Sequence, residues 1–414
     1  MNAIQHTESD IRYLLSPQAI RERTLKIYEH AIAGRTHFKV NEAMLDEVAE
    51  FVLETTLANY PDLKIPFHSR WGHFRVGGMD RLADLDSQLR ALDPAERART
   101  KLDLVIASVL LDAGAGMSWK FTEGAKTFGR SEGLAVASLH MFLNGDFSSS
   151  PAHPLRVDSE GLKRLSVERL AQGFQVSEKN PLVGLKGRVQ LLRSLGAAIE
   201  KDQERFGGAH GIARPGAIFD FCLKKAVKTD GKLQATELLL AVLHGLGPIW
   251  PGRIQLGSTP MGDVWPHPLL GGGASAQGLV PFHKLSQWLT YSLIEPIEEA
   301  GLPVVGVDQL TGLAEYRNGG LVLDKKLIEL RDPALASKVH RPDSELVIEW
   351  RALTLVLLEQ IAERVRERLG KTSDELPLAK VLEGGTWWAG RKIAAELRSD
   401  GSPPLKIESD GTVF

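Results

Sequence analysis

The sequence predicts a mainly helical fold of two lobes with a few short β-hairpins. Apolar residues recur at helical spacing over much of the chain, which is typical of amphipathic helices. The regular alternation of strands and helices that indicates a parallel sheet is absent, and no segment repeats at a fixed period. We expect lobes over residues 11–228 and 229–414, joined near Lys228, with a pocket between them where glycine- and proline-rich loops converge.

Composition limits the classes of partner. The 414 residues are 43% hydrophobic and 25% charged, with a formal net charge of −2, so a broad basic surface for nucleic acid is not expected. Cys222 is the single cysteine and lies in an apolar context, which excludes an intramolecular disulfide and favours a cytoplasmic location. The N-terminus lacks the pattern of an export signal, and no apolar run approaches the roughly 20 residues that span a bilayer.

Helices are predicted throughout the first half of the chain. Asp93 followed by Pro94 is a typical helix start, with a capping side chain before proline at the first helical position. The stretch KIPFHSRWGHFRVGG interrupts the helical periodicity and is interpreted as a functional loop, and DAGAG after Leu111 lets backbone approach a ligand closely. The predicted helices cover Pro17 to Ala33, Asn41 to Asn59, Asp80 to Leu92, Pro94 to Leu111, Glu160 to Phe174 and Thr236 to Leu246, with another opening at Asn180-Pro181.

The segment from Leu279 to Leu330 has the composition of a site. Its uncharged run Leu285 to Ile294 still carries polar residues, and in a helix Lys284, Gln287 and Tyr291 lie on one stripe, which we expect to line a pocket. Farther along, Glu315 and Arg317 flank Tyr316 directly before Asn-Gly-Gly, which predicts a sharp reversal with positive φ. A carboxylate on such a turn is easily aimed at a cavity.

The last hundred residues combine predicted hairpins with helices. The residues from Gly320 to Leu330 are expected to form a small hairpin, and Glu349-Trp350-Arg351 leads into an amphipathic helix. The motif EGGTWWAGR precedes another short helix. The terminal LKIESDGTVF is predicted to form two strands around Asp410-Gly411, because Asp-Gly is a strong two-residue hairpin signal.

Motif screening excludes several common chemistries. The sequence has no P-loop, no dinucleotide-binding glycine pattern after a strand, no H-E-x-x-H and no C-x-x-C motif. His68 and His73 are five residues apart, and His267 and His283 lie in other segments, so the fold itself would have to assemble a zinc site of His and carboxylate ligands. Neither a metal nor a cofactor is expected.

Several long motifs together resemble a family of uracil-catabolism proteins, long catalogued as a domain of unknown function, whose members accompany a pathway that degrades uracil through ribosylurea. The similarity extends from about Tyr13 to Phe414. The motifs are HSRWGHFRVGGMDRL, LLDAGAG, RSEGLAVASLHMF, NPLVGL, VPFHKLSQWLTYSLIEP, LTGLAEYRNGGL, IEWRALT, LEGGTWWAGR and SDGTVF.

A more distant resemblance concerns the chemistry. AEYRNGG and IEWRA resemble the D-Y-R and E-I-R motifs of queuosine nucleoside glycosylases, and FHKLSQ resembles their F-x-K-x-x-Q stretch. That family is helical, resembles DNA glycosylases in fold and cleaves an N-glycosidic bond. Glu315 stands where that family has aspartate, which implies a different substrate.

These resemblances imply hydrolysis of ribosylurea, or of a phosphorylated form, with release of urea. Cleavage of an N-ribosyl bond passes through an oxocarbenium-like state, which requires a carboxylate near the anomeric carbon and an acid for the leaving nitrogen. The expected catalytic residues are Glu315, Asp112 and Asp308, and the identity of the acid stays open, since Glu349 or the His283-Lys284 pair could also assist the leaving group. The expected substrate-binding residues are His283, Lys284, Gln287, Tyr291, Arg317, Glu349, Arg351, His68, Trp71, Arg75 and Asp410.

Other interpretations stay open from the sequence. The protein could be a non-catalytic ureide- or nucleotide-binding partner of a pathway enzyme, or a ribosyl or phosphoribosyl transferase. Glu315 and Arg317 could form a structural ion pair, and Glu349 with Arg351 could anchor a helix N-terminus. The sequence leaves open the oligomeric state and whether the substrate carries a 5-phosphate.

Overall fold

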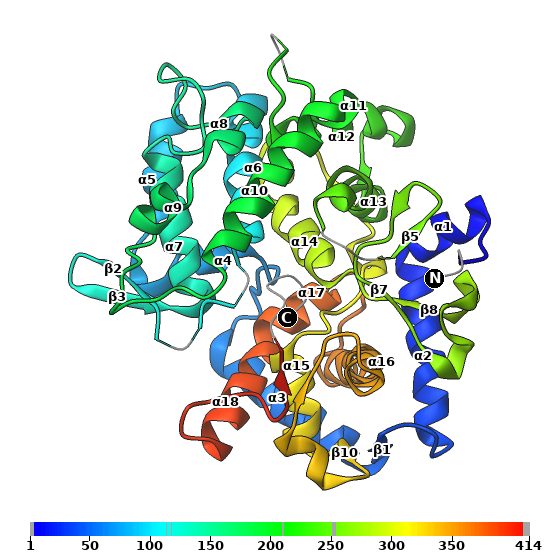
Figure 1. The fold of residues 1–414 in the computed structure, drawn as a ribbon. Coiled ribbons are helices and arrows are strands. Elements are labelled where there is room, and N and C mark those ends of the chain that lie inside the picture. The colour runs from blue at the N-terminus through cyan, green and yellow to red at the C-terminus, as the bar shows by residue number, and fades with distance from the viewer. Residues whose placement is uncertain (1–3, 113, 117, 209–210, 251–253, 409–414) are drawn as a thin grey trace. The chain divides into compact units, whose positions relative to one another are not determined.

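The structure is a computed structural model that describes residues 4–112, 114–116, 118–208, 211–250 and 254–408, and it is mainly helical, as predicted (Figure 1). The chain divides into two compact units. The first unit comprises residues 1–68, 252–288 and 306–414, and the second comprises residues 69–251 and 289–305. Each unit therefore combines stretches that are distant in sequence, and the predicted junction at Lys228 lies inside the second unit.

Helices α2, α3, α15 and α16 form the framework of the first unit. The 25-residue helix α16 packs against the other three (Figure 1), and apolar residues of α2, α16 and strand β8 share one core cluster. The helices of this unit are α1 (Glu8–Leu14), α2 (Pro17–Ile32), α3 (Leu45–Asn59), α15 (Tyr316–Asp324), α16 (Glu345–Leu369), α17 (Leu378–Val381) and α18 (Trp387–Leu397). The helix α14 (Lys284–Glu299) begins in the first unit and continues in the second.

The strands of the first unit are short, and two of their pairs, β1–β10 and β11–β12, join segments that are distant in sequence. Antiparallel pairs join β1 to β10, β5 to β6 and β7 to β8, and a parallel pair joins β11 to β12. In the first pair, Phe38 lies opposite Leu330 and Val40 opposite Ile328. The strands are β1 (Phe38–Val40), β5 (Gln255–Leu256), β6 (Thr259–Pro260), β7 (Val264–Pro266), β8 (Leu279–Pro281), β10 (Ile328–Leu330), β11 (Val339–His340) and β12 (Lys406–Ile407).

The second unit is organised around two long helices, α6 and α10. Helix α6 packs against α7 and α12, and α10 packs against α8, α9 and α13 (Figure 1). Its helices are α4 (Arg70–Phe74), α5 (Arg81–Leu89), α6 (Pro94–Leu110), α7 (Arg130–Leu143), α8 (Ser159–Arg164), α9 (Val167–Gly173), α10 (Leu185–Lys201), α11 (Gln203–Phe206), α12 (Ile218–Ala226) and α13 (Ala235–Leu246). Its strands are β2 (Lys120–Glu123) and β3 (Lys126–Gly129), which form a hairpin, and β4 (Leu233–Gln234) and β9 (Val304–Val305), which pair in parallel.

Several predicted helices start within a residue of their expected position, but Asn41 makes no side-chain cap and α10 begins at Leu185, after the expected start at Asn180-Pro181. Asp93 caps α6 by accepting a hydrogen bond from the Glu96 N–H at 2.9 Å, and Ser16 caps α2, which begins at Pro17. The region from Glu160 to Phe174, predicted as one helix, is two, because Ser166 caps a new helix and accepts a hydrogen bond from the Arg169 N–H.

Other segments depart from the prediction. The loop expected around His68 contains the short helix α4, and the glycine- and proline-rich residues 247–278 contain β5 to β7 and several 3-10 turns. The hairpin expected from Gly320 to Leu330 is wrong, because α15 occupies its first half and the strand β10 pairs with the distant β1. At the C-terminus β12 pairs with β11, and the Asp410-Gly411 turn lies outside the described residues.

The Asn318-Gly319-Gly320 segment is helical and does not form the expected reversal, since neither glycine has a positive φ. Glycine is needed here for close packing. The Trp350 indole N–H donates to the Gly319 carbonyl at 2.9 Å, and a Cβ on Gly319 would lie 2.8 Å from the Trp350 ring. Helix α18 approaches as closely, because a Cβ on Gly390 would lie 2.3 Å from the Arg317 carbonyl oxygen. These contacts fix the position of α15, which carries Glu315 at its start.

Candidate functional site

Glu315 is the N-cap of α15. Its backbone is extended, with φ −119° and ψ 165°, and its side chain turns back over the first helical turn. One carboxylate oxygen accepts the Arg317 N–H at 2.7 Å and the other accepts the Asn318 N–H at 2.6 Å. The side chain is buried, with the residue 7% exposed, so two backbone dipoles at a helix N-terminus hold this carboxylate in one orientation.

The electrostatic environment of Glu315 differs from that of an ordinary cap. Burial raises the pKa of the carboxyl group above its ordinary value, and this effect outweighs the opposing backbone hydrogen bonds from Arg317 and Asn318. Lys284 and His68 act on it as nearby positive charges and lower the pKa to a smaller extent. The site therefore contains a buried acid whose charged form is under-solvated, with an ammonium and an imidazole close by.

Arg317 does not pair with this acid. Its guanidinium donates to the Gly401 carbonyl at 2.8 Å and lies over the Tyr316 ring, with 5.0 Å from the guanidinium carbon to the ring centroid. Within the described part of the chain, no ion pair joins the side chains of Glu315 and Arg317. Arg317 thus ties α15 to the segment after α18.

His68 is held by an acidic partner that sequence reasoning did not single out. Its Nδ1 lies 2.8 Å from the Glu383 carboxylate, and Tyr60 donates to the same carboxylate at 3.1 Å. Burial and the Glu383 carboxylate raise the pKa of Tyr60, which keeps its hydroxyl protonated as a donor. Glu383 lies in a π-helical turn, Leu382–Thr386, between α17 and α18. Such wide turns are frequent at functional sites, but no local sequence pattern predicts one.

Gln287 carries the clearest unsatisfied polar group. The residue is 0% exposed, and neither its amide nitrogen nor its amide oxygen has a hydrogen-bond partner among the described residues. Gln287 lies one turn after Lys284 on α14, as the predicted stripe requires. A buried amide without partners is costly, which makes Gln287 a candidate for binding a group with complementary donors and acceptors. Tyr291, the third residue of the stripe, is fully buried and belongs to the second unit.

Asp263 forms a two-point ion pair beside this segment, and sequence reasoning missed it. The Arg351 guanidinium binds both of its carboxylate oxygens, at 2.8 and 2.6 Å, and the Lys284 N–H donates to it at 3.1 Å. Arg351 also lies over the Phe282 ring, 4.0 Å from its centroid. One signal was present in the sequence, because Asp263 is the only Asp, Glu, Lys or Arg between Ile254 and His283.

Glu349 does not orient Arg351, although the two are close in sequence. Residues two apart on a helix face different directions. Glu349 is 2% exposed and accepts the His37 N–H at 2.7 Å, with the His37 ring at 2.9 Å. The buried His267 ring lies 3.5 Å from the other oxygen of the same carboxylate. Glu349 therefore links α16 to the segments around His37 and His267.

The predicted residues of the second unit form a different arrangement. Asp112 accepts hydrogen bonds from the fully buried Arg70 guanidinium at 2.8 Å and from the Ser131 hydroxyl at 3.1 Å. Trp71 is buried, and its indole N–H donates to the Ser292 carbonyl at 2.8 Å, whereas Arg75 is exposed. Asp112 and Trp71 have the contacts of structural groups.

Among the described residues, no hydrogen bond or ion pair joins the remaining predicted residues, His283 and Asp308, to Glu315. His283 is buried, its Nε2 hydrogen-bonds to the Leu14 carbonyl at 2.8 Å, and burial lowers its pKa, which favours the neutral ring. Asp308 is half-buried at a 3-10 turn and accepts a weak hydrogen bond from Ser373 at 3.4 Å. Asp410 lies outside the described residues.

The described residues contain no candidate metal site and no candidate membrane span. No three His, Cys, Asp or Glu side chains in the described part of the chain are placed to hold one metal ion. No described helix has the length and apolar character needed to cross a bilayer.

The fold and the site define a mainly helical protein with a buried carboxylate at a helix N-terminus. Residues 13–414 match the family model described as "Protein of unknown function (DUF1688)", and the chain belongs to that family. Protein urg3 of Schizosaccharomyces pombe is 41% identical over 409 residues, covering 97% of this chain and 98% of that protein. Uracil catabolism protein 4 of Lachancea kluyveri is 36% identical over 445 residues, covering 98% and 99%. The family resemblance inferred from the motifs is confirmed.

Proposed function

We propose that this protein takes part in uracil catabolism and hydrolyses the N-glycosidic bond of ribosylurea, or of its phosphorylated form, with release of urea. The role in uracil catabolism is supported by the printed name of a relative that is 36% identical over nearly its whole length. The buried Glu315 carboxylate carries the chemical part of the proposal. Its fixed orientation suits the stabilisation of an oxocarbenium-like transition state, and its raised pKa suits the uptake of a proton from water, while the nearby positive charges favour the ionised carboxylate.

The proposed reaction assigns each group a role. The bond between C1 of the ribosyl group and the urea nitrogen breaks, and its electron pair passes to nitrogen, which takes up a proton. A water oxygen bonds to C1 and loses a proton. We assign Glu315 to stabilise the cationic C1 and to receive the water proton. We assign His68 to supply the proton to nitrogen, since Glu383 holds the other side of its ring.

Recognition of urea is assigned to Gln287. Its amide offers an oxygen acceptor and N–H donors, and urea presents a carbonyl and N–H groups that match them in pairs. The unsatisfied state of this buried amide supports the assignment. A ligand that lacks the carbonyl next to the N–H would leave one half of the amide unsatisfied, so we expect selectivity for a ureide.

The test must separate catalysis from helix capping, because Glu315 also caps α15. Aspartate is a favoured cap and keeps the charge, but it withdraws the carboxylate by one methylene. Glutamine keeps the length and removes the charge. We therefore expect both Glu315→Asp and Glu315→Gln to lower urea release from ribosylurea by about 10²- to 10³-fold, with Glu315→Asp folded as stably as the wild type.

Controls decide between this function and its alternatives. Ser166→Ala removes an unrelated helix cap and should leave the rate unchanged after correction for the folded fraction. Full activity of folded Glu315→Asp would reduce Glu315 to a structural cap. Saturable binding of ribosylurea without urea release would favour a non-catalytic binding partner. Turnover that requires pyrophosphate would favour a transferase.

A further inference from the structure

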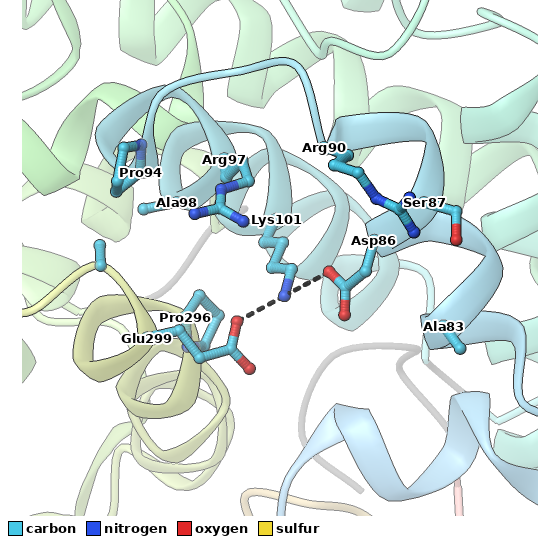
Figure 2. Close-up of a pocket in the computed structure, with 11 residues that line it drawn as sticks. Ala83, Asp86, Ser87, Arg90, Pro94, Arg97, Ala98, Lys101, Pro296 and Glu299 are labelled. Carbon is cyan, nitrogen blue, oxygen red and sulfur yellow. Dashed lines mark hydrogen bonds and ion pairs between the residues drawn. The ribbon is translucent and has the colours of Figure 1, made fainter.

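The second unit contains a cavity that the proposed reaction does not use. It has a volume of about 530 Å³, which is the size of a small-molecule site, and three helices line it (Figure 2). Helices α5 and α6 supply most of the charged side chains, and α14 supplies Pro296 and Glu299. Figure 2 shows Arg90, Arg97 and Lys101 at the cavity together with Asp86 and Glu299.

Lys101 forms ion pairs with both carboxylates that line the cavity. Its ammonium binds Asp86 at 2.7 Å and also contacts Glu299, as the dashed lines in Figure 2 show. Burial disfavours the charged amine, but the hydrogen bonds that the ammonium donates to Asp86 and Glu299 outweigh this effect and raise the pKa of Lys101. The charged ammonium therefore bridges the two carboxylates.

Arg90 and Arg97 line the same cavity and, within the described ranges, form no ion pair or side-chain hydrogen bond. Each lacks the partner that helical spacing offers. Asp86 lies four residues before Arg90 but binds Lys101, and Asp93 lies four residues before Arg97 but caps α6. Arg97 also lies four residues before Lys101, so two like charges share one face of α6.

The positive charges of Arg90 and Arg97 therefore have no carboxylate partner within the described ranges. Exposed arginines on helices normally gain from a carboxylate three or four residues away, and here both local carboxylates are diverted while a like charge is adjacent. An anion between the two guanidiniums would supply the missing compensation. Guanidinium groups match phosphate oxygens in geometry and bind them with charge-assisted hydrogen bonds.

We propose that the cavity between α5, α6 and α14 binds an organic phosphate, with Arg90 and Arg97 on the phosphate group. The volume exceeds that of a single phosphate ion, so the organic part fills the remainder against Pro296, Ala98 and Ala300. The Lys101 bridge holds the walls together and keeps the acids from repelling the ligand. This site is independent of the reaction proposed for Glu315.

The test uses the full chain and isothermal titration with ribose 5-phosphate and uridine 5′-monophosphate as probes. We expect one saturable site per chain that Arg90→Gln with Arg97→Gln weakens at least tenfold. Arg164→Gln with Lys201→Gln is the matched control, because it removes two positive charges from exposed positions of the same unit, and it should change affinity less than twofold. Thermal melting of both double variants without ligand checks that each is folded.

Further ligands separate the contribution of the phosphate group to affinity from that of the organic part. Inorganic phosphate should bind more weakly than the organic phosphates, and uridine should not bind. Equal affinity for succinate would overturn the phosphate assignment in favour of a general anion site. Equal binding of an organic phosphate to the wild type and to the Arg90→Gln, Arg97→Gln variant would overturn the cavity as the site, even if the wild type hydrolyses ribosylurea.

Discussion

Glu315 and Asp112 are two carboxylates that were both predicted to be catalytic from the sequence. In the structure, different groups stabilise their negative charges. Asp112 accepts from a fully buried guanidinium and a hydroxyl, so its charge is neutralised by protein. Glu315 accepts hydrogen bonds from two backbone N–H groups and from no other group of the described residues, and burial raises its pKa. A carboxylate that already has a cationic partner is best suited to a structural role. One compensated by neutral dipoles keeps its charge available for a substrate.

The largest effect is expected at the compensated acid. Asp112→Asn leaves the Arg70 guanidinium buried without its carboxylate, which should lower the free energy of unfolding by about 3 to 5 kcal/mol. Chemical denaturation of the variant measures it. The control is Asp84→Asn on the exposed surface of α5, which should change stability by less than about 0.5 kcal/mol. A stable Asp112→Asn protein with no activity would reverse the roles given to the two acids.

A second prediction extends the comparison to Asp263. Arg351→Lys replaces a planar fork by a point charge, so one of the two hydrogen bonds to Asp263 is lost and stability should fall by about 1.5 to 3 kcal/mol. Arg341→Lys is a matched control, because Arg341 forms the same two-point contact with Asp343 on the surface. It should cost less than about 1 kcal/mol. Equal losses in denaturation experiments would show that burial does not matter to these pairs.

The third prediction concerns the buried Gln287 amide, which has no hydrogen-bond partner among the described residues. Gln287→Met removes two unsatisfied polar atoms at similar volume and should raise the free energy of unfolding by about 1 to 2 kcal/mol. The same change should raise KM for ribosylurea, because it removes the proposed contact with urea. Gln18→Met on an exposed helix surface serves as the control and should be neutral in both respects. Destabilisation by Gln287→Met would mean that protein groups already satisfy the amide.

The smallest expected effect is a pH dependence. The pKa of Glu315 is raised in the folded state above its ordinary value of 4.5, so the folded protein binds more protons than the unfolded chain between these two values. This group therefore lowers stability as pH rises through that window, and its contribution is constant above the folded pKa. Denaturation of wild type and Glu315→Gln from pH 4 to 8 should show the variant gaining relative stability as pH increases. A difference that does not change with pH would contradict the raised pKa.

The helical part of the fold was predictable because its signals are local. Caps such as Ser16 and Asp93, each followed by proline, mark a helix start without reference to the rest of the chain. The strands were not predictable, because Phe38–Val40 is only three residues long and its partner, Ile328–Leu330, lies almost 300 residues away. So short a segment has no periodicity of its own, and tertiary contacts alone determine its pairing.

The candidate site was predictable only in part, for a similar reason. Glu315 and Gln287 stand in distinctive motifs, but Asn-Gly-Gly after Glu315 fits a turn as well as a tightly packed helix start. The contact of Gly319 with Trp350 decides between them, and it joins separate helices. Arg70 and Glu383 were missed because their importance comes from full burial and from partners about 40 and 315 residues away in sequence.

The π-helical turn at Leu382–Thr386 makes the environment of His68 depend on chain length as well as on residue identity. A π turn holds one residue more than an α turn, so it has the form of a single-residue insertion in an otherwise continuous helix from Leu378 to Leu397. Deleting one residue there would rotate every later residue of α18 by about 100°. Glu383 would keep its place, but Trp387, whose ring lies 5.6 Å from that of His68, would face elsewhere. An alignment gap of one residue at this turn therefore marks a relative with a differently built site.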